Sequence, residues 1–185
     1  MNGPRRRELL LAAGALAAAP LRAALRDGPV QPPELAPDLL LTDAAGRRRR
    51  LAKLLQGRVT LVQLMFTGCS TVCPTQGLLF ATLAARPRAV EIGWLSISID
   101  ALGDDPARLA AWQAKHGAHP AWQAAVPGVG DVERLSTWLR GVPVKPGTHN
   151  TQAYAVDAAG RLRWRSGEQP SAAEIERVVS ALAGA

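Results

Sequence analysis

Apolar and polar positions along the chain alternate in the way typical of a domain that mixes buried strands with amphipathic helices. Residues 58–66 are mostly apolar or β-branched, which predicts a strand buried on both faces. Residues 90–99 predict a second buried strand, and 121–126 a short third one. Four helices are expected, at residues 74–86, 107–116, 131–140 and 171–182.

Two further segments have the pattern of β-hairpins. The first covers residues 38–51 with its turn at 43–46, and the second covers 152–165 with its turn at 157–160. Residues 51–55 predict one short helical turn after the first hairpin. This order of strands and helices predicts an α/β fold, with a layered sheet and an N-terminal β-hairpin.

The 185 residues fit one globular domain rather than two, and we assign it to residues 38–185. Residues 1–23 have a basic start, a short apolar run and small residues after it, which indicates an export signal of the twin-arginine type. The apolar run is too short to cross a bilayer, so we expect no stable membrane span after cleavage. A membrane tether remains if the signal is not cleaved. Residues 24–37 are rich in proline and predict an extended linker.

The net charge of +7 invites a nucleic-acid interpretation, but much of it belongs to the export signal. Four arginines and one acid lie in residues 1–23, and removing those three net charges leaves +4. The four consecutive arginines at 47–50 are interpreted as a solvated strand edge that resists strand pairing. We therefore expect an exported, periplasmic protein that does not bind nucleic acid.

The chemistry is concentrated where the first buried strand ends. Cys69 and Cys73 straddle a strand-to-helix turn, with Pro74 at a position suited to the first turn of a helix. A helix N-terminus favours a thiolate, so we expect Cys73 to have its pKa lowered the most. Two thiolates on one side of such a turn suit a soft metal ion or a reversible disulfide.

The alternative is a structural disulfide, because an exported chain with two cysteines can form a single stabilising bridge between them. Such a bridge would close only three intervening residues and would therefore constrain the unfolded chain very little. A reactive pair is the stronger interpretation.

His149 is the histidine best placed to join the cysteines. It follows an irregular segment rich in Pro and Gly, and it immediately precedes the strand predicted at 152–156. A histidine on a loop entering a strand can face a cysteine turn at the same sheet edge. Two sulfurs and one imidazole nitrogen would fit copper, either as Cu(I) or, with another donor, as Cu(II).

Three motifs together resemble the Sco/SenC family: residues 66–75 around the cysteines, 96–106 at the end of the second strand, and 148–160 around the histidine. These proteins have a thioredoxin-like fold, with a central mixed sheet flanked by helices, and they are copper metallochaperones that serve assembly of the CuA site of cytochrome c oxidase. The resemblance implies that Cys69, Cys73 and His149 are copper ligands and that the two cysteines can form a disulfide. It also implies an apo copper-acceptor protein as partner, namely a cytochrome c oxidase subunit. The chain departs from the family at Thr148, where the family usually has Asp, and at Ala101, where it commonly has Pro.

Three other residues are weaker candidates. Asp100 lies at the end of the second strand. It either contacts a metal ligand from behind, and so adjusts the properties of the cysteines, or caps a loop. His116 and His119 have a spacing that a metal site could use, but a helix C-terminus also favours a positive side chain at His116.

Two functions therefore stay open at the level of sequence. The first is copper delivery through Cys69, Cys73 and His149, and the second is a thiol-disulfide oxidoreductase that reduces the cysteines of a partner protein. A peroxide-reducing enzyme would need an arginine beside the reactive cysteine and Thr67, and no arginine can be assigned to that role.

Overall fold

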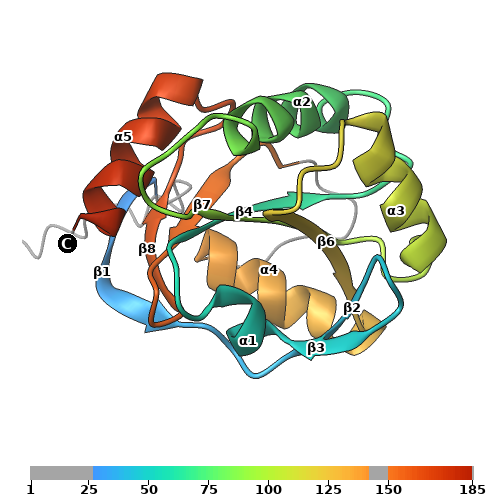
Figure 1. Cartoon of the computed structure of the whole chain (residues 1–185). Coiled ribbons are helices and arrows are strands. Elements are labelled where there is room, and N and C mark those ends of the chain that lie inside the picture. The colour runs from blue at the N-terminus through green and yellow to red at the C-terminus, as the bar shows by residue number, and fades with distance from the viewer. Residues whose placement is uncertain (1–26, 142–149, 185) are drawn as a thin grey trace, which may run out of the picture.

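The computed structural model describes residues 27–141 and 150–184. Within them, one eight-stranded mixed sheet runs in the order β1-β8-β7-β4-β5-β6-β2-β3 (Figure 1). The strands are β1 Gly28–Leu35, β2 Leu40–Asp43, β3 Arg48–Arg50, β4 Thr60–Met65, β5 Gly93–Ser98, β6 Trp122–Pro127, β7 Ala153–Val156 and β8 Arg161–Arg165. The helices are α1 Leu51–Leu55, α2 Cys73–Ala84, α3 Pro106–Lys115, α4 Val132–Arg140 and α5 Ala172–Ala183, with a 3-10 turn, η1, at Val129–Asp131.

The centre of the sheet is parallel and its flanks are antiparallel. Strand β5 pairs parallel with β4 on one side and with β6 on the other, whereas every other pairing in the sheet is antiparallel. All six residues of β4 are buried, as its mostly apolar or β-branched sequence predicted. The α/β fold predicted from the sequence, a mixed sheet flanked by helices, is confirmed.

The sheet separates two hydrophobic cores, because successive side chains on a strand point to opposite faces. On one face, Leu61 and Met65 of β4 pack in a cluster with side chains from α2, α3 and α5. On the other face, Val62 and Leu64 pack with side chains from α1 and α4. Figure 1 shows the same division, with α2, α3 and α5 on one side of the sheet and α1 and α4 on the other. None of the described helices is long and apolar enough to cross a membrane.

The prediction of a linker at residues 24–37 is wrong for most of its length. Gly28–Leu35 is strand β1, which pairs antiparallel with β8 at one edge of the sheet. Val30 of this strand is buried in the hydrophobic core on the face of the sheet covered by α1 and α4. Prolines are tolerated on an edge strand, where one side of the backbone needs no ladder hydrogen bonds, so a Pro-rich segment can still belong to a sheet. The predicted export signal, residues 1–23, lies outside the described residues.

The antiparallel pairing of β4 and β7 determines which chain segments lie next to the cysteine turn. Strand β7 runs antiparallel to β4, with Ala153 opposite Gln63. The residues just before β7 therefore lie at the same end of the strands as the residues just after β4. This register brings residues 150–152, which directly precede β7, to the end of the sheet that carries the cysteine turn.

Candidate metal and thiol site

The two cysteines lie at the junction between β4 and α2. Cys69 stands in the turn after β4, and its backbone N–H donates to the carbonyl oxygen of Phe66 at 3.2 Å. Cys73 is the first residue of α2, with Pro74 directly behind it. Cys69 is only 8% exposed and Cys73 only 3% exposed, and both are thiols rather than halves of a disulfide. The sequence prediction that both belong to one strand-to-helix turn is confirmed.

The two thiols differ sharply in acidity, and the order is the reverse of the one predicted from the helix N-terminus. Burial raises the pKa of Cys69, but hydrogen bonds from Cys73 and Thr71 outweigh it and lower that pKa to about 6. Burial, together with the hydrogen bond that its thiol makes to Cys69, raises the pKa of Cys73 to about 12. Cys73 therefore acts as the donor that stabilises a thiolate on Cys69. The expectation that Cys73 would be the more acidic residue is wrong, because burial and the hydrogen bond to Cys69 raise its pKa.

A buried carboxylate fixes the start of the cysteine turn. Asp104 lies after β5 and is 7% exposed. Its Oδ2 accepts from the Thr67 backbone N–H at 2.9 Å and from the Ser98 hydroxyl at 2.6 Å, while its Oδ1 accepts from the Thr67 hydroxyl at 2.5 Å. The residue thus joins the ends of β4 and β5. The neighbouring Asp105 has a different role, since it caps α3 by accepting from the Arg108 N–H.

The segment that enters β7 is held against α2. The Gln76 side chain, one turn into α2, donates through Nε2 to the carbonyl oxygen of Gln152 at 2.9 Å. The buried Asn150 donates through Nδ2 to Gln152 Oε1 at 3.0 Å, and its Oδ1 accepts from the Tyr154 hydroxyl at 3.1 Å. Thr151 donates to the Glu168 carboxylate through its backbone N–H and its hydroxyl. These contacts anchor the chain directly after His149.

His149 itself lies outside the described residues, so its role as a ligand stays a prediction. Within the described part of the chain, no group of three or more His, Cys, Asp or Glu side chains could hold a metal ion. The two cysteines therefore have no third protein ligand of these types among the described residues.

His116 and His119 have structural contacts instead of a shared site. His116 is the C-cap of α3; its Nδ1 lies 2.8 Å from the carbonyl oxygen of Trp112, and its ring packs on the Trp112 indole. His119 accepts through Nδ1 from the Ala121 N–H at 3.2 Å. Asp100 is exposed and accepts from the Gly103 N–H at 2.9 Å, which is the loop-capping role.

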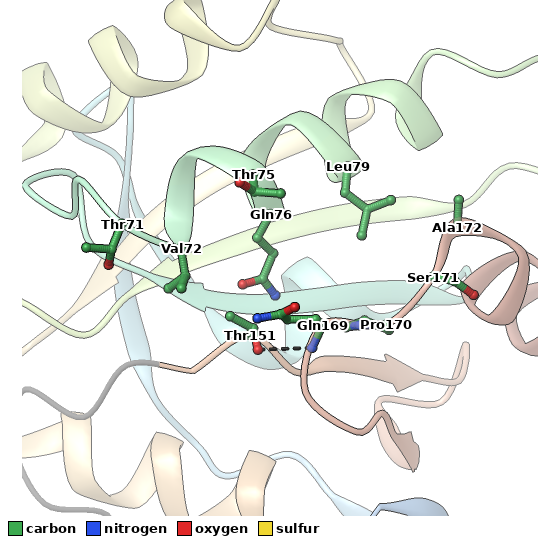
Figure 2. A pocket seen from close by; sticks show the side chains of 10 residues that line it. All are labelled: Thr71, Val72, Thr75, Gln76, Leu79, Thr151, Gln169, Pro170, Ser171 and Ala172. Carbon is green, nitrogen blue, oxygen red and sulfur yellow. Dashed lines mark hydrogen bonds between the residues drawn. The ribbon is translucent and has the colours of Figure 1, made fainter.

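A cavity of about 400 Å³ borders the cysteine turn (Figure 2). One wall is formed by α2 and by Thr71 and Val72, which stand between the two cysteines in the sequence. The opposite wall is formed by Thr151 and by the segment that joins β8 to α5. This cavity could not be predicted from the sequence, because its walls come from segments about 80 to 100 positions apart.

A protein-family model for SCO1/SenC matches residues 28–128, which include β1, the cysteine turn and the Asp104 anchor. The chain belongs to the SCO1/SenC family. The matched region begins at β1, in agreement with the finding that this segment is part of the sheet. A search of curated protein sequences returned no match.

Solved structures of Sco proteins share the fold. A SCO1/SenC family lipoprotein from Bacillus anthracis str. Ames is 27% identical, with a TM-score of 0.73 over 86% of this chain and 99% of that one. Yeast Sco1 with copper bound is 22% identical, with a TM-score of 0.63 over 80% of this chain and 88% of that one. Bradyrhizobium japonicum ScoI with copper bound is 20% identical, with a TM-score of 0.61 over 80% and 99%. The thioredoxin-like fold expected from the sequence motifs is therefore confirmed.

Proposed function

We propose that this protein is an exported, periplasmic metallochaperone that binds one copper ion through Cys69, Cys73 and His149. Its acceptor in this proposal is an apoprotein with a CuA-type site, such as a subunit of cytochrome c oxidase. The observation that carries the proposal is the pair of buried thiols in hydrogen-bond contact at the start of α2.

The donor set fits copper for a chemical reason. Thiolate sulfur is a soft ligand that selects Cu(I), and imidazole nitrogen suits either copper oxidation state. One thiolate is already favoured near neutral pH, since the pKa of Cys69 is lowered to about 6. The raised pKa of Cys73 means that binding copper would displace its proton.

The contacts around β7 support His149 as the third ligand. Gln76 lies three residues after Cys73, and its side chain bonds to Gln152, three residues after His149. Three residues of extended chain span at most about 10 Å, so the chain is long enough for His149 to be brought toward the thiols. Relatives of known structure described as copper-bound share this fold.

A competition titration with a Cu(I) chelator tests the assignment. The reduced protein should bind one copper ion per chain, and Cys69→Ser, Cys73→Ser and His149→Ala should each weaken binding by at least about tenfold, the loss expected for a ligand or its partner. His116→Ala is the matched control and should leave the affinity unchanged. Tight binding that survives His149→Ala would refute the ligand set.

Thiol-disulfide exchange is a second candidate, and the split in acidity favours it. The Cys69 thiolate would attack one sulfur of a partner's disulfide, forming a mixed disulfide and releasing the other partner cysteine as a thiolate. Cys73 would then lose its proton and attack the Cys69 sulfur, releasing the second partner cysteine. The pair gives up two electrons and becomes a disulfide. His149→Ala separates the two functions, because it should abolish tight copper binding while exchange continues.

A further inference from the structure

Met65 carries a third sulfur atom close to the cysteine turn, and neither reaction described above uses it. It is the last residue of β4, four positions before Cys69, and its side chain is buried. Met1 is the only other methionine in the sequence. A buried methionine is often a flexible filler of the core, so its place relative to the two thiols decides whether it can do more.

The Met65 side chain lies on the same face of the sheet as both cysteines. Successive side chains of a strand point to opposite faces, and Met65 belongs with Leu61 to the core cluster covered by α2, α3 and α5. Cys69 and Cys73 belong to that same cluster, whereas Leu64 packs on the opposite face. The thioether therefore lies on the side of the sheet where α2 begins at Cys73.

A backbone contact keeps Met65 close to the Cys73 sulfur. The backbone N–H of Phe66 donates to that sulfur, and the Phe66 nitrogen is joined to the Met65 Cα through a single carbonyl carbon. The Cys73 thiol in turn donates to the Cys69 sulfur. A methionine side chain has three rotatable bonds, which bring Sδ within reach of an ion that both thiols hold.

Thioether sulfur has a defined preference among the copper oxidation states. Thiolate and thioether are soft ligands that select Cu(I), and in trigonal copper sites a weak, long axial thioether contact tunes the reduction potential. A thioether is uncharged, so its burial in an apolar core avoids the cost of burying a charged donor. It also has no proton to lose when a metal ion binds.

We propose that Met65 Sδ is a weak axial contact of the copper ion held by Cys69 and Cys73, longer than the two thiolate bonds, and that it favours Cu(I) over Cu(II). The inference rests on the proposed function in one respect, that these two cysteines bind copper. The thiolates remain the main sulfur ligands, and the thioether approaches the ion from the core side of the turn.

X-ray absorption at the selenium edge tests this contact on the full chain, labelled with selenomethionine and loaded with copper. The label places selenium at Met1 and Met65. In the reduced, loaded protein we expect a copper atom beside selenium, beyond the two carbons bonded to it. Met65→Leu keeps the volume of the core side chain and leaves selenium at Met1 alone, so the copper neighbour should be lost.

Met65→Leu combined with Leu61→Met is the matched control. It keeps the composition of β4 and the face of the sheet, but it moves the selenium four residues, roughly 13 Å, along the strand. The copper neighbour should be absent here as well. Chelator titration of Met65→Leu should show Cu(I) affinity lowered by about tenfold, the lower end of the effect of residues that support a metal site, and Cu(II) affinity unchanged.

Wild-type selenium without a copper neighbour, in protein whose copper edge still shows two sulfur ligands, would overturn this inference and leave the proposed function standing. A copper neighbour that persists in Met65→Leu or in the double variant would overturn it too. So would equal losses of Cu(I) and Cu(II) affinity, which indicate altered packing rather than a lost thioether. Protein that binds no copper would refute the proposed function, and this inference with it.

Discussion

Cys69 and Cys73 share one turn yet differ in acidity, and the cause is the direction of the hydrogen bond between them. Cys73 is the more deeply buried of the two and donates its proton, which raises its own pKa to about 12. Cys69 receives that bond and a contact from the Thr71 hydroxyl at 3.6 Å, and its pKa falls to about 6. In the proposed functions, Cys69 would therefore be the attacking sulfur in exchange and the first thiolate available to copper.

Alkylation by iodoacetamide should reveal this asymmetry in the reduced protein. A thiolate reacts and a thiol does not, so the fast phase should rise with pH through a midpoint of about 6, the lowered pKa of Cys69. Peptide mapping should find the label on Cys69 and not on Cys73. A midpoint near 8.5, the value of an ordinary cysteine, would show that the hydrogen bonds do not stabilise the thiolate.

The sequence was sufficient to place both cysteines on one turn, because a breaker after an apolar strand and a proline before a helix are local signals. It could not rank their acidities, because that ranking depends on burial and on which thiol donates. The predicted role of His149 still depends on the contact between α2 and the start of β7, which is a tertiary feature.

Among the secondary-structure elements, the ends of β4 and β5 are joined by Asp104. Three hydrogen bonds converge on this one carboxylate, two from Thr67 and one from Ser98. Thr67 lies two residues before Cys69, so the anchor holds the entry to the cysteine turn. The motif that contains Asp104 was visible in the sequence, but its partners on two strands were not.

Asp104→Ala should lower the free energy of unfolding by about 3 kcal/mol, because it leaves buried donors without an acceptor. It should also speed alkylation of Cys69 by loosening the turn. The neighbouring Asp105→Ala is the matched control: it removes only the α3 cap, at a cost of about 1 kcal/mol, and should leave alkylation unchanged. Urea denaturation and alkylation kinetics measure both effects. Equal alkylation rates in the two variants would argue against the anchor.

At the scale of the whole molecule, the sheet contains a strand, β1, that was not predicted from the sequence. Strand β1 adds to β8, and the Glu34 carboxylate accepts from the buried Arg165 at 3.1 Å. The Trp138 indole N–H also donates to the Glu34 carbonyl oxygen at 3.3 Å, which ties β1 to α4. Hydrophobic periodicity predicted the central strands correctly because both of their faces are buried. It missed β1 because prolines and one-sided burial hide an edge strand.

A chain that begins at Ala36 should be less stable than one that begins at Asp27. The loss of β1 exposes core surface now covered by Val30 and deprives the Arg165 guanidinium of its carboxylate, which together should cost about 3 kcal/mol or more in free energy of unfolding. Thermal unfolding followed by circular dichroism measures the difference. Identical melting temperatures would mean that this segment is a linker after all.

The most direct test of the account is X-ray absorption spectroscopy at the copper edge on the loaded, reduced protein and on His149→Ala. The account predicts two sulfur ligands and one nitrogen ligand in the wild type. In His149→Ala it predicts two sulfurs with the imidazole signal lost. Copper bound without sulfur, or an imidazole signal that persists in His149→Ala, would contradict the proposed site.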